Sequence, residues 1–234
     1  ATLGRLFSIR ALLISIGQVL GALLSFKLAD CLGRRNSLLI LNFFGILNAF
    51  SGKLSTYLLS YEVFFAFEFL SGLLFGFWAI ILPLYFFEIS SINFRGFVSI
   101  LGNQFSYTLG IIGAIALGSR YLLGTDDLWY LVHSGLVLIP CAASFGLLFA
   151  AESPAHLYIN KNNKEEAEKV LISLRGSKNT DLVKRELEEL EKEKISKKKP
   201  NFFHLFTRKS QRHSLFLVLI MQLCQFFSGI TLVN

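Results

Sequence analysis

The feature that most constrains this chain is a series of six long apolar runs. They lie near residues 8–29, 36–54, 61–86, 97–118, 128–150 and 213–234. A helix of about 20 mostly apolar residues can span a bilayer, where the backbone has no hydrogen-bond partner but itself. Only 17% of the residues are charged, against about 25% in soluble domains. The sequence therefore predicts an all-α membrane protein rather than a soluble domain with a large core.

The apolar runs divide the chain into three parts. Residues 1–150 are predicted to form a bundle of five membrane helices, and residues 213–234 part of a further one. Residues 151–212 are rich in charge and contain two stretches with apolar residues at helical spacing, so we expect a cytoplasmic helical linker there. Gly176 suits the end of the first of these helices. Because the chain lacks an initiating Met and stops inside a run, we expect a fragment of a longer membrane protein.

The basic residues predict an orientation in the membrane. Arg34, Arg35 and Arg95 lie in two loops on one side, whereas the opposite loops hold only Lys53 and Arg120. Cytoplasmic loops are enriched in Lys and Arg near the ends of spans. The segments expected in the cytoplasm are 28–37, 87–96 and 151–212. The net charge of +7 follows from this topology, so no nucleic-acid partner is predicted.

Signatures of catalysis are missing from the sequence. The three cysteines show no paired spacing, and no nucleophile–base pair, metal-ligand spacing or phosphate-binding loop is present. We therefore predict a protein that is not an enzyme and that needs no cofactor or metal.

Charged residues gather at the predicted cytoplasmic ends of the spans. They are Asp30, Arg34, Arg35, Glu88, Arg95 and Glu152. Gly33 permits a tight turn between the first two spans. An exposed ion pair is worth only about 0–1 kcal/mol, and more when it is partly dehydrated. A network of several pairs is therefore predicted to bias an equilibrium between two conformations.

Several of these loops resemble one known family. The segments are DCLGRR at 30–35, PLYFFEISSINFRG at 83–96, DDLW at 126–129, AESPAHLYIN at 151–160 and QLCQFFSGI at 222–230. In this order they resemble the facilitative glucose (hexose) transporters, which are sugar porters of the major facilitator superfamily. The chain departs from the family pattern at Phe26, Cys31, Ala151 and Ala155. The resemblance covers the whole chain, from the second helix of twelve to part of the seventh.

The resemblance implies a function and a role for the charges. It implies a transporter that moves a hexose-type sugar across a membrane, expected to be the plasma membrane, by alternating access. The six charged residues would clamp the two halves of the protein while the sugar site faces outward. The implied partners are a small sugar, the lipid bilayer and the C-terminal half of the same chain. Two alternatives remain open, namely a proton-coupled sugar symporter of the same fold and a sugar sensor that does not transport.

Amide side chains in the middle of spans are the candidates for a sugar site, because amides both donate and accept hydrogen bonds. The predicted site residues are Asn103, Gln104, Gln222, Gln225 and Ile230. Any one such amide can instead bond a neighbouring helix. The resemblance implies that Gln225, and one of Asn103 and Gln104, contact the sugar. It also implies that Phe226 and Thr231 replace two sugar-binding amides, which puts glucose itself in doubt.

One acidic residue lies inside an apolar run. Glu68 occupies a position where the family resemblance leads us to expect Arg. A charged group inside a membrane is costly and often functional. The alternative is an acid near the membrane interface that bonds to a neighbouring span.

Overall fold

The computed structural model describes residues 2–58, 60–91, 94–125, 128, 131–132, 138, 141–142, 144–176, 180–196, 212–213, 216–217 and 220. Across these residues the secondary structure consists of helices and turns, without a strand. The chain divides into two compact units, Ala1–Leu190 and Glu191–Asn234. The elements in order are α1 Thr2–Leu32, α2 Arg34–Ala49, α3 Ser51–Leu58, α4 Tyr61–Ile89, α5 Arg95–Leu117, η2 Ser144–Leu148, η3 His156–Asn160, α7 Lys164–Arg175 and α8 Thr180–Ser196.

Four of the helical stretches are long and apolar enough to cross a membrane. They are Gly4–Leu32, Arg34–Ser55, Tyr61–Ile89 and Arg95–Leu117. They coincide with the first four predicted spans, so the all-α membrane fold class is confirmed. The predicted spans at 128–150 and 213–234 lie largely outside the described residues. The division of the chain at residues 150 and 212 therefore stays a prediction.

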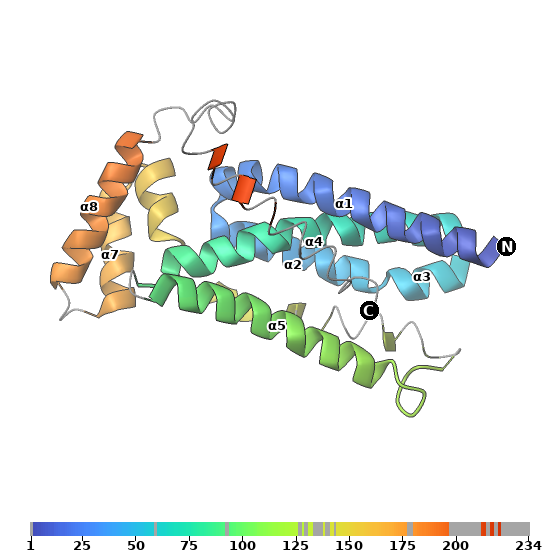
Figure 1. Ribbon diagram of the computed structural model, residues 1–234. Helices are drawn as coiled ribbons and strands as arrows, with labels where there is room; N and C mark the ends of the chain where they lie inside the picture. Colours follow the sequence, from blue (N-terminus) through green and yellow to red (C-terminus); the bar gives the residue numbers. More distant parts are fainter. Residues whose placement is uncertain are drawn as a thin grey trace. The chain divides into compact units, whose positions relative to one another are not determined.

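Glycines allow α1 and α4 to pack with their backbones in contact (Figure 1). A Cβ atom added to Gly21 would lie 2.1 Å from the carbonyl oxygen of Leu73, and one added to Gly72 would lie 2.2 Å from that of Ile14. Each glycine has a partner four residues away, Gly17 on α1 and Gly76 on α4, with similarly close contacts. Small residues four apart let membrane helices approach closely. Since residue 14 meets 72 and residue 18 meets 76, the two helices are parallel.

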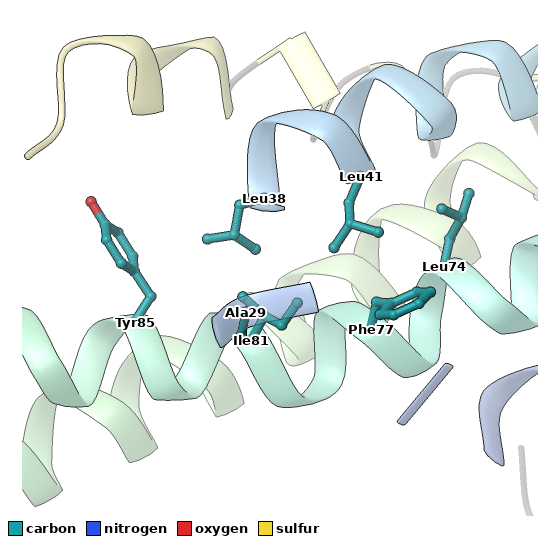
Figure 2. Packing of buried hydrophobic residues seen from close by; sticks show 7 residues of the cluster. All are labelled: Ala29, Leu38, Leu41, Leu74, Phe77, Ile81 and Tyr85. Atoms are coloured by element: carbon teal, nitrogen blue, oxygen red, sulfur yellow. The ribbon is translucent and has the colours of Figure 1, made fainter. Parts of the chain in front are cut away.

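A buried apolar cluster joins α1, α2 and α4 next to this helix pair (Figure 2). It consists of Ala29, Leu38, Leu41, Leu74, Phe77, Ile81 and Tyr85. Leu38 and Ile81 have no exposed surface. The cluster packs the end of α1 and the start of α2 against α4, next to the place where the charged side chains meet.

The charged linker folds into short helices that pack on one another. Leu157 and Tyr158 of η3, Ala167 and Leu171 of α7, and Val183 and Leu190 of α8 form its buried core. The Asn163 side chain accepts a hydrogen bond from the N–H of Glu166 and caps α7. Gly176 ends α7 with φ +83°, a conformation that favours glycine. The predicted helices of this segment, and the stop at Gly176, are confirmed.

Candidate functional site: a buried charge cluster at the α1–α2 turn

The α1–α2 turn depends on a glycine for two reasons. Gly33 has φ +94°, which L side chains rarely adopt. A Cβ atom at this position would also lie 2.6 Å from Oε2 of Glu152 and 3.1 Å from Cδ2 of His156. The turn therefore lies directly against the segment that precedes and begins η3.

Arg34 is the centre of the charge cluster. Its side chain is only 5% exposed, and its Nε lies 2.9 Å from Oε2 of Glu88 at the end of α4. The two N–H groups of its Nη1 are shared among three neighbours, namely the carbonyl oxygen of Ala29 at 3.1 Å, Oδ1 of Asp30 at 3.3 Å and Nδ1 of His156 at 3.1 Å. The guanidinium group thus joins α1, α2, α4 and η3. Charge-assisted bonds of this kind are stronger than neutral ones.

Glu152 binds the start of α2 through its backbone. Its Oε1 accepts hydrogen bonds from the N–H groups of Arg34 at 2.9 Å and Arg35 at 3.0 Å. It also accepts one from the N–H of Ser153 at 2.9 Å. The first N–H groups of a helix have no partner within the helix, and the helix dipole favours an anion there. The carboxylate therefore supplies the N-terminal cap that Gly33 lacks.

The remaining contacts close the cluster. The Ser153 hydroxyl donates to Oε2 of Glu88 and accepts from the N–H of His156 at 3.2 Å. The Arg35 side chain donates to the carbonyl oxygens of Leu147 at 2.9 Å and Leu148 at 2.5 Å. Asn160 donates to Oδ1 of Asp30 at 3.1 Å. We use the term Arg34 cluster below for Asp30, Arg34, Arg35, Glu88, Glu152, Ser153 and His156.

His156 and Ser153 are the two members of the Arg34 cluster that the sequence analysis did not predict, and His156 is the one that can titrate. Its side chain is buried, with 1% of its surface exposed. Burial, and then the neighbouring Arg34 cation, lower the pKa of the imidazole below its ordinary value. No sequence pattern singles out His156. It directly follows Ala155, which stands where the family resemblance implies an Arg.

Arg95 does not join the Arg34 cluster, although the sequence grouped it with those residues. Its Nη1 lies 3.7 Å from Oε2 of Glu189 on α8. Its guanidinium also lies 5.3 Å from the ring centre of Phe87, a cation–π distance. A second arginine, Arg175 of α7, binds Glu186 at 3.0 Å and donates to the carbonyl oxygen of Ile89 at 2.7 Å. Two arginines therefore connect the linker helices with the region between α4 and α5.

The candidate sugar-binding residues are not brought together by the described structure. The Gln104 side chain lies exposed on α5. Asn103 is also on α5, but its side chain lies outside the described residues. Gln222, Gln225 and Ile230 lie outside them as well. The predicted sugar site therefore stays a prediction.

Glu68 has a partner on the neighbouring helix. Its carboxylate is 4% exposed, and its Oε1 accepts a hydrogen bond from Nε of Arg10 on α1 at 3.0 Å. The Arg10 guanidinium also lies 5.7 Å from the ring centre of Phe64. Of the two readings offered by the sequence, bonding to a neighbouring span is the one that the geometry matches.

With this arrangement described, the comparison with known families decides the assignment. The sequence model described as "Sugar (and other) transporter" matches residues 4–234. The chain belongs to this sugar transporter family. The chain is also 32% identical over 234 residues to the solute carrier family 2, facilitated glucose transporter member 1 of Gallus gallus, and covers 47% of that protein. It is 34% identical over 233 residues to member 5 of the same family from Mus musculus, covering 46% of it. This sugar transporter chain thus spans about half the length of the curated relatives that it matches.

Solved structures agree on the fold. The xylose transporter XylE from E. coli, in a partially occluded inward-open conformation, matches 80% of this sugar transporter chain with a TM-score of 0.63 and 23% identity, and 46% of XylE is covered. A structure of the proton:xylose symporter XylE bound to 6-bromo-6-deoxy-D-glucose gives a TM-score of 0.61 and 24% identity, over 79% of this chain and 42% of that one. The fold of the major facilitator superfamily is therefore confirmed. The chain is a multi-pass membrane protein.

Proposed function

We propose that the full-length protein moves a hexose-type sugar across a membrane by alternating access, without coupling to protons. The observation that carries this proposal is the family match over residues 4–234, together with 32% identity to a facilitated glucose transporter along the whole chain. Transporters of this fold alternate by rocking two bundles around a site at the middle of the membrane. Helices α1 to α5 would belong to the first bundle. The second bundle would begin near residue 213.

In this proposal the Arg34 cluster lies on the cytoplasmic side of the plasma membrane. The excess of basic residues in the α1–α2 turn, the α4–α5 loop and the linker supports that orientation. The cluster holds the ends of α1, α2 and α4 against the segment that leads into the linker helices. A bundle held in this way moves as one body, and the clamp between the two halves would act through the linker that Arg95 and Arg175 contact.

The substrate is proposed to differ from the glucose after which the similar facilitated glucose transporters are named. Gln222, Gln225, Ile230 and one of Asn103 and Gln104 would contact the sugar, whereas by the family resemblance Phe226 and Thr231 stand where two sugar-binding amides are expected. A hydrogen bond contributes about 0.5–1.5 kcal/mol. Two lost bonds therefore weaken the binding of glucose by roughly 5- to 150-fold. The proposed substrate is a hexose other than glucose, or glucose bound with low affinity.

The test is uptake of labelled hexoses by cells that lack hexose uptake of their own and express the full-length protein. Uptake should saturate, and an imposed pH gradient should not drive accumulation of the sugar against its own concentration gradient. Gln104→Ala should reduce uptake, while the double variant Phe226→Gln/Thr231→Asn should gain affinity for glucose. Uptake that follows the pH gradient would favour a proton-coupled symporter, and sugar binding without uptake would favour a sensor. Saturable glucose transport of high affinity, unchanged in the double variant, would contradict the proposed substrate.

A further inference from the structure

His156 makes an unusual contact inside the Arg34 cluster. Its Nδ1 lies 3.1 Å from Nη1 of Arg34, and both side chains are almost completely buried. A guanidinium group has five N–H donors and no acceptor. Nδ1 of His156 must therefore be the acceptor, which requires it to carry no proton. The imidazole is neutral in this arrangement, with its single proton on Nε2.

Two buried polar atoms lie unsatisfied at the other edge of the imidazole ring, one in the ring itself and one in Glu152. Among the described residues, Nε2 of His156 is buried without a hydrogen-bond partner, and so is Oε2 of Glu152. Both side chains lie against the Cα of Gly33, where a Cβ would meet Oε2 of Glu152 and Cδ2 of His156. A buried polar atom without a partner costs about 1–3 kcal/mol. These two unsatisfied atoms therefore lower the net stability of the Arg34 cluster around the His156 ring.

Further protonation would change the ring on the side that faces Arg34. The second proton of an imidazolium must go to Nδ1, because Nε2 already carries one. Two N–H donors and two positive charges would then be 3.1 Å apart in a buried site. Buried like charges disfavour the charged state of one partner, and here that partner is His156, because Arg is always protonated.

Charged groups on several elements surround His156. They are Arg34 of α2, Glu152 before η3, Lys161 after η3 and Asp30 of α1. Glu88 of α4 is one step further away, through Ser153 and Arg34. The two acids oppose the two cations, but burial and Arg34 are the larger influences, and together they lower the pKa of His156.

We propose that His156 is a proton-operated release for the Arg34 cluster. A neutral His156 accepts a hydrogen bond from Arg34 and keeps the α1–α2 turn closed onto η3. Protonation at Nδ1 breaks this contact and separates the turn from the segment that leads into the linker helices. If the proposed transport function holds, acidification on the side of the membrane where the Arg34 cluster lies thereby changes the balance between the transporter's conformations.

The direction of the pH effect follows from linkage. In the open arrangement, where His156 is solvated, its pKa is near the ordinary value of about 6.5. In the closed arrangement its pKa is lower, so the open arrangement binds more protons. The closed arrangement is fully favoured above about pH 6.5 and loses up to about tenfold in relative population for each pH unit below that value.

The experiment measures how often the turn opens as a function of pH. Ser37 is completely buried one helical turn after Gly33, and its hydroxyl donates to the carbonyl oxygens of Leu28 and Gly33. Ser37→Cys is introduced into the full-length protein, with Cys31, which is exposed, kept as the only other thiol. Labelling at the two sites is quantified by peptide mass spectrometry between pH 7.5 and pH 5.5. The ratio of the two rates removes most of the ordinary pH dependence of thiol chemistry.

The matched control is His156→Gln, whose amide oxygen can accept from Arg34 but which does not titrate. His156→Asn serves the same purpose if His156→Gln does not fold. The ratio of labelling at position 37 to labelling at Cys31 should rise by more than about twofold, and by up to about tenfold, in the His156 protein as the pH falls to 5.5. It should change by less than about twofold in the control. A ratio that stays flat with His156 present, or that rises equally in the control, would overturn the proposal.

Hexose uptake is measured at pH 7.5 on the same protein. Uptake without pH-dependent labelling would refute the His156 release and leave the proposed transport function standing. Labelling that depends on His156, in a protein that takes up no hexose, would refute the transport function while the proton-operated opening remains.

Discussion

The parallel helices α1 and α4 are held together by charges in two places that are built very differently. Where α1 leads into α2, Arg34 contacts Glu88, Asp30, His156 and the carbonyl of Ala29. Toward the start of both helices, a single pair joins Arg10 to Glu68. The Arg34 side chain is 5% exposed, whereas that of Arg10 is 41% exposed. Between the two places, the helices touch through glycines.

This difference shows what each place can contribute. A buried cation with several partners is expensive to strip of any one of them, because the others remain desolvated. When a pair with an exposed cation is broken, water can solvate that cation again. The Arg34 cluster is therefore suited to an all-or-none change, whereas the Arg10–Glu68 pair acts as a simple tie. The glycine contact keeps α1 and α4 in register for both.

The largest effect should come from breaking the glycine contact on which both places depend. Gly72→Ala puts a methyl group 2.2 Å from the carbonyl oxygen of Ile14, so the helices must separate. We expect a loss of about 3 kcal/mol or more in stability, measured as thermal unfolding in detergent, or loss of folded protein. The matched control is Gly113→Ala on α5, where a Cβ has no atom of the described residues within 4 Å, so the change should be neutral or slightly stabilising. Equal effects of the two changes would show that the close packing is unimportant.

Removing the central cation should come next. Arg34→Met removes the buried cation that Glu88 and the neighbouring acceptors bind, at an expected cost of about 3–5 kcal/mol. Asp30→Asn removes only a partner that is 62% exposed, and should cost less than about 1 kcal/mol. Thermal unfolding of both variants measures the difference. A cost for Arg34→Met no larger than that for Asp30→Asn would contradict the buried cluster.

The Arg10–Glu68 pair should show a smaller effect that a second change reverses. Arg10→Met leaves the buried Glu68 carboxylate alone, and we expect a cost of about 1–3 kcal/mol. The double variant Arg10→Met/Glu68→Leu removes both charges and should recover most of that loss, because apolar replacements of buried pairs are often neutral. Chemical or thermal unfolding of the single and double variants tests the cycle. If the two losses simply add, the residues are not coupled.

The smallest effect is expected at Arg95. Its contact with Glu189 is 3.7 Å long and half exposed on the acid's side. Arg95→Met should cost less than about 1 kcal/mol. Raising the salt concentration should weaken the Arg95–Glu189 contact and so lower the stability of the native protein, whereas Arg95→Met has no such contact to lose. A large, salt-independent cost would instead place Arg95 among the residues that behave like Arg34.

Much of the fold was predictable because its causes are local. The four described spans are apolar over about 20 residues each, and hydrocarbon admits little besides a helix at such a length. Gly176 was predictable as a helix end because the residue type and the position agree. The glycine contact between α1 and α4 was missed, although Gly17 and Gly21, and Gly72 and Gly76, have the small-residue spacing that could have revealed it.

The candidate site was predictable only in its residue types. Sequence position grouped Arg95 with Arg34, yet the two arginines have different partners in the structure. It gave no reason to place His156, Ser153 or Asn160 beside the charged residues that they contact. Those residues are more than 100 positions from the α1–α2 turn, and their approach depends on how the helices pack.

The sequence by itself determined that this chain spans a membrane, that its charges gather at the ends of spans, and that it belongs with the sugar transporters. These properties follow from composition and local order, which hold for any packing of the helices. Only the tertiary structure decided which charges meet. Ion pairs and hydrogen bonds act over about 3 Å, so they depend on helix register, on the glycine contact and on the left-handed turn at Gly33.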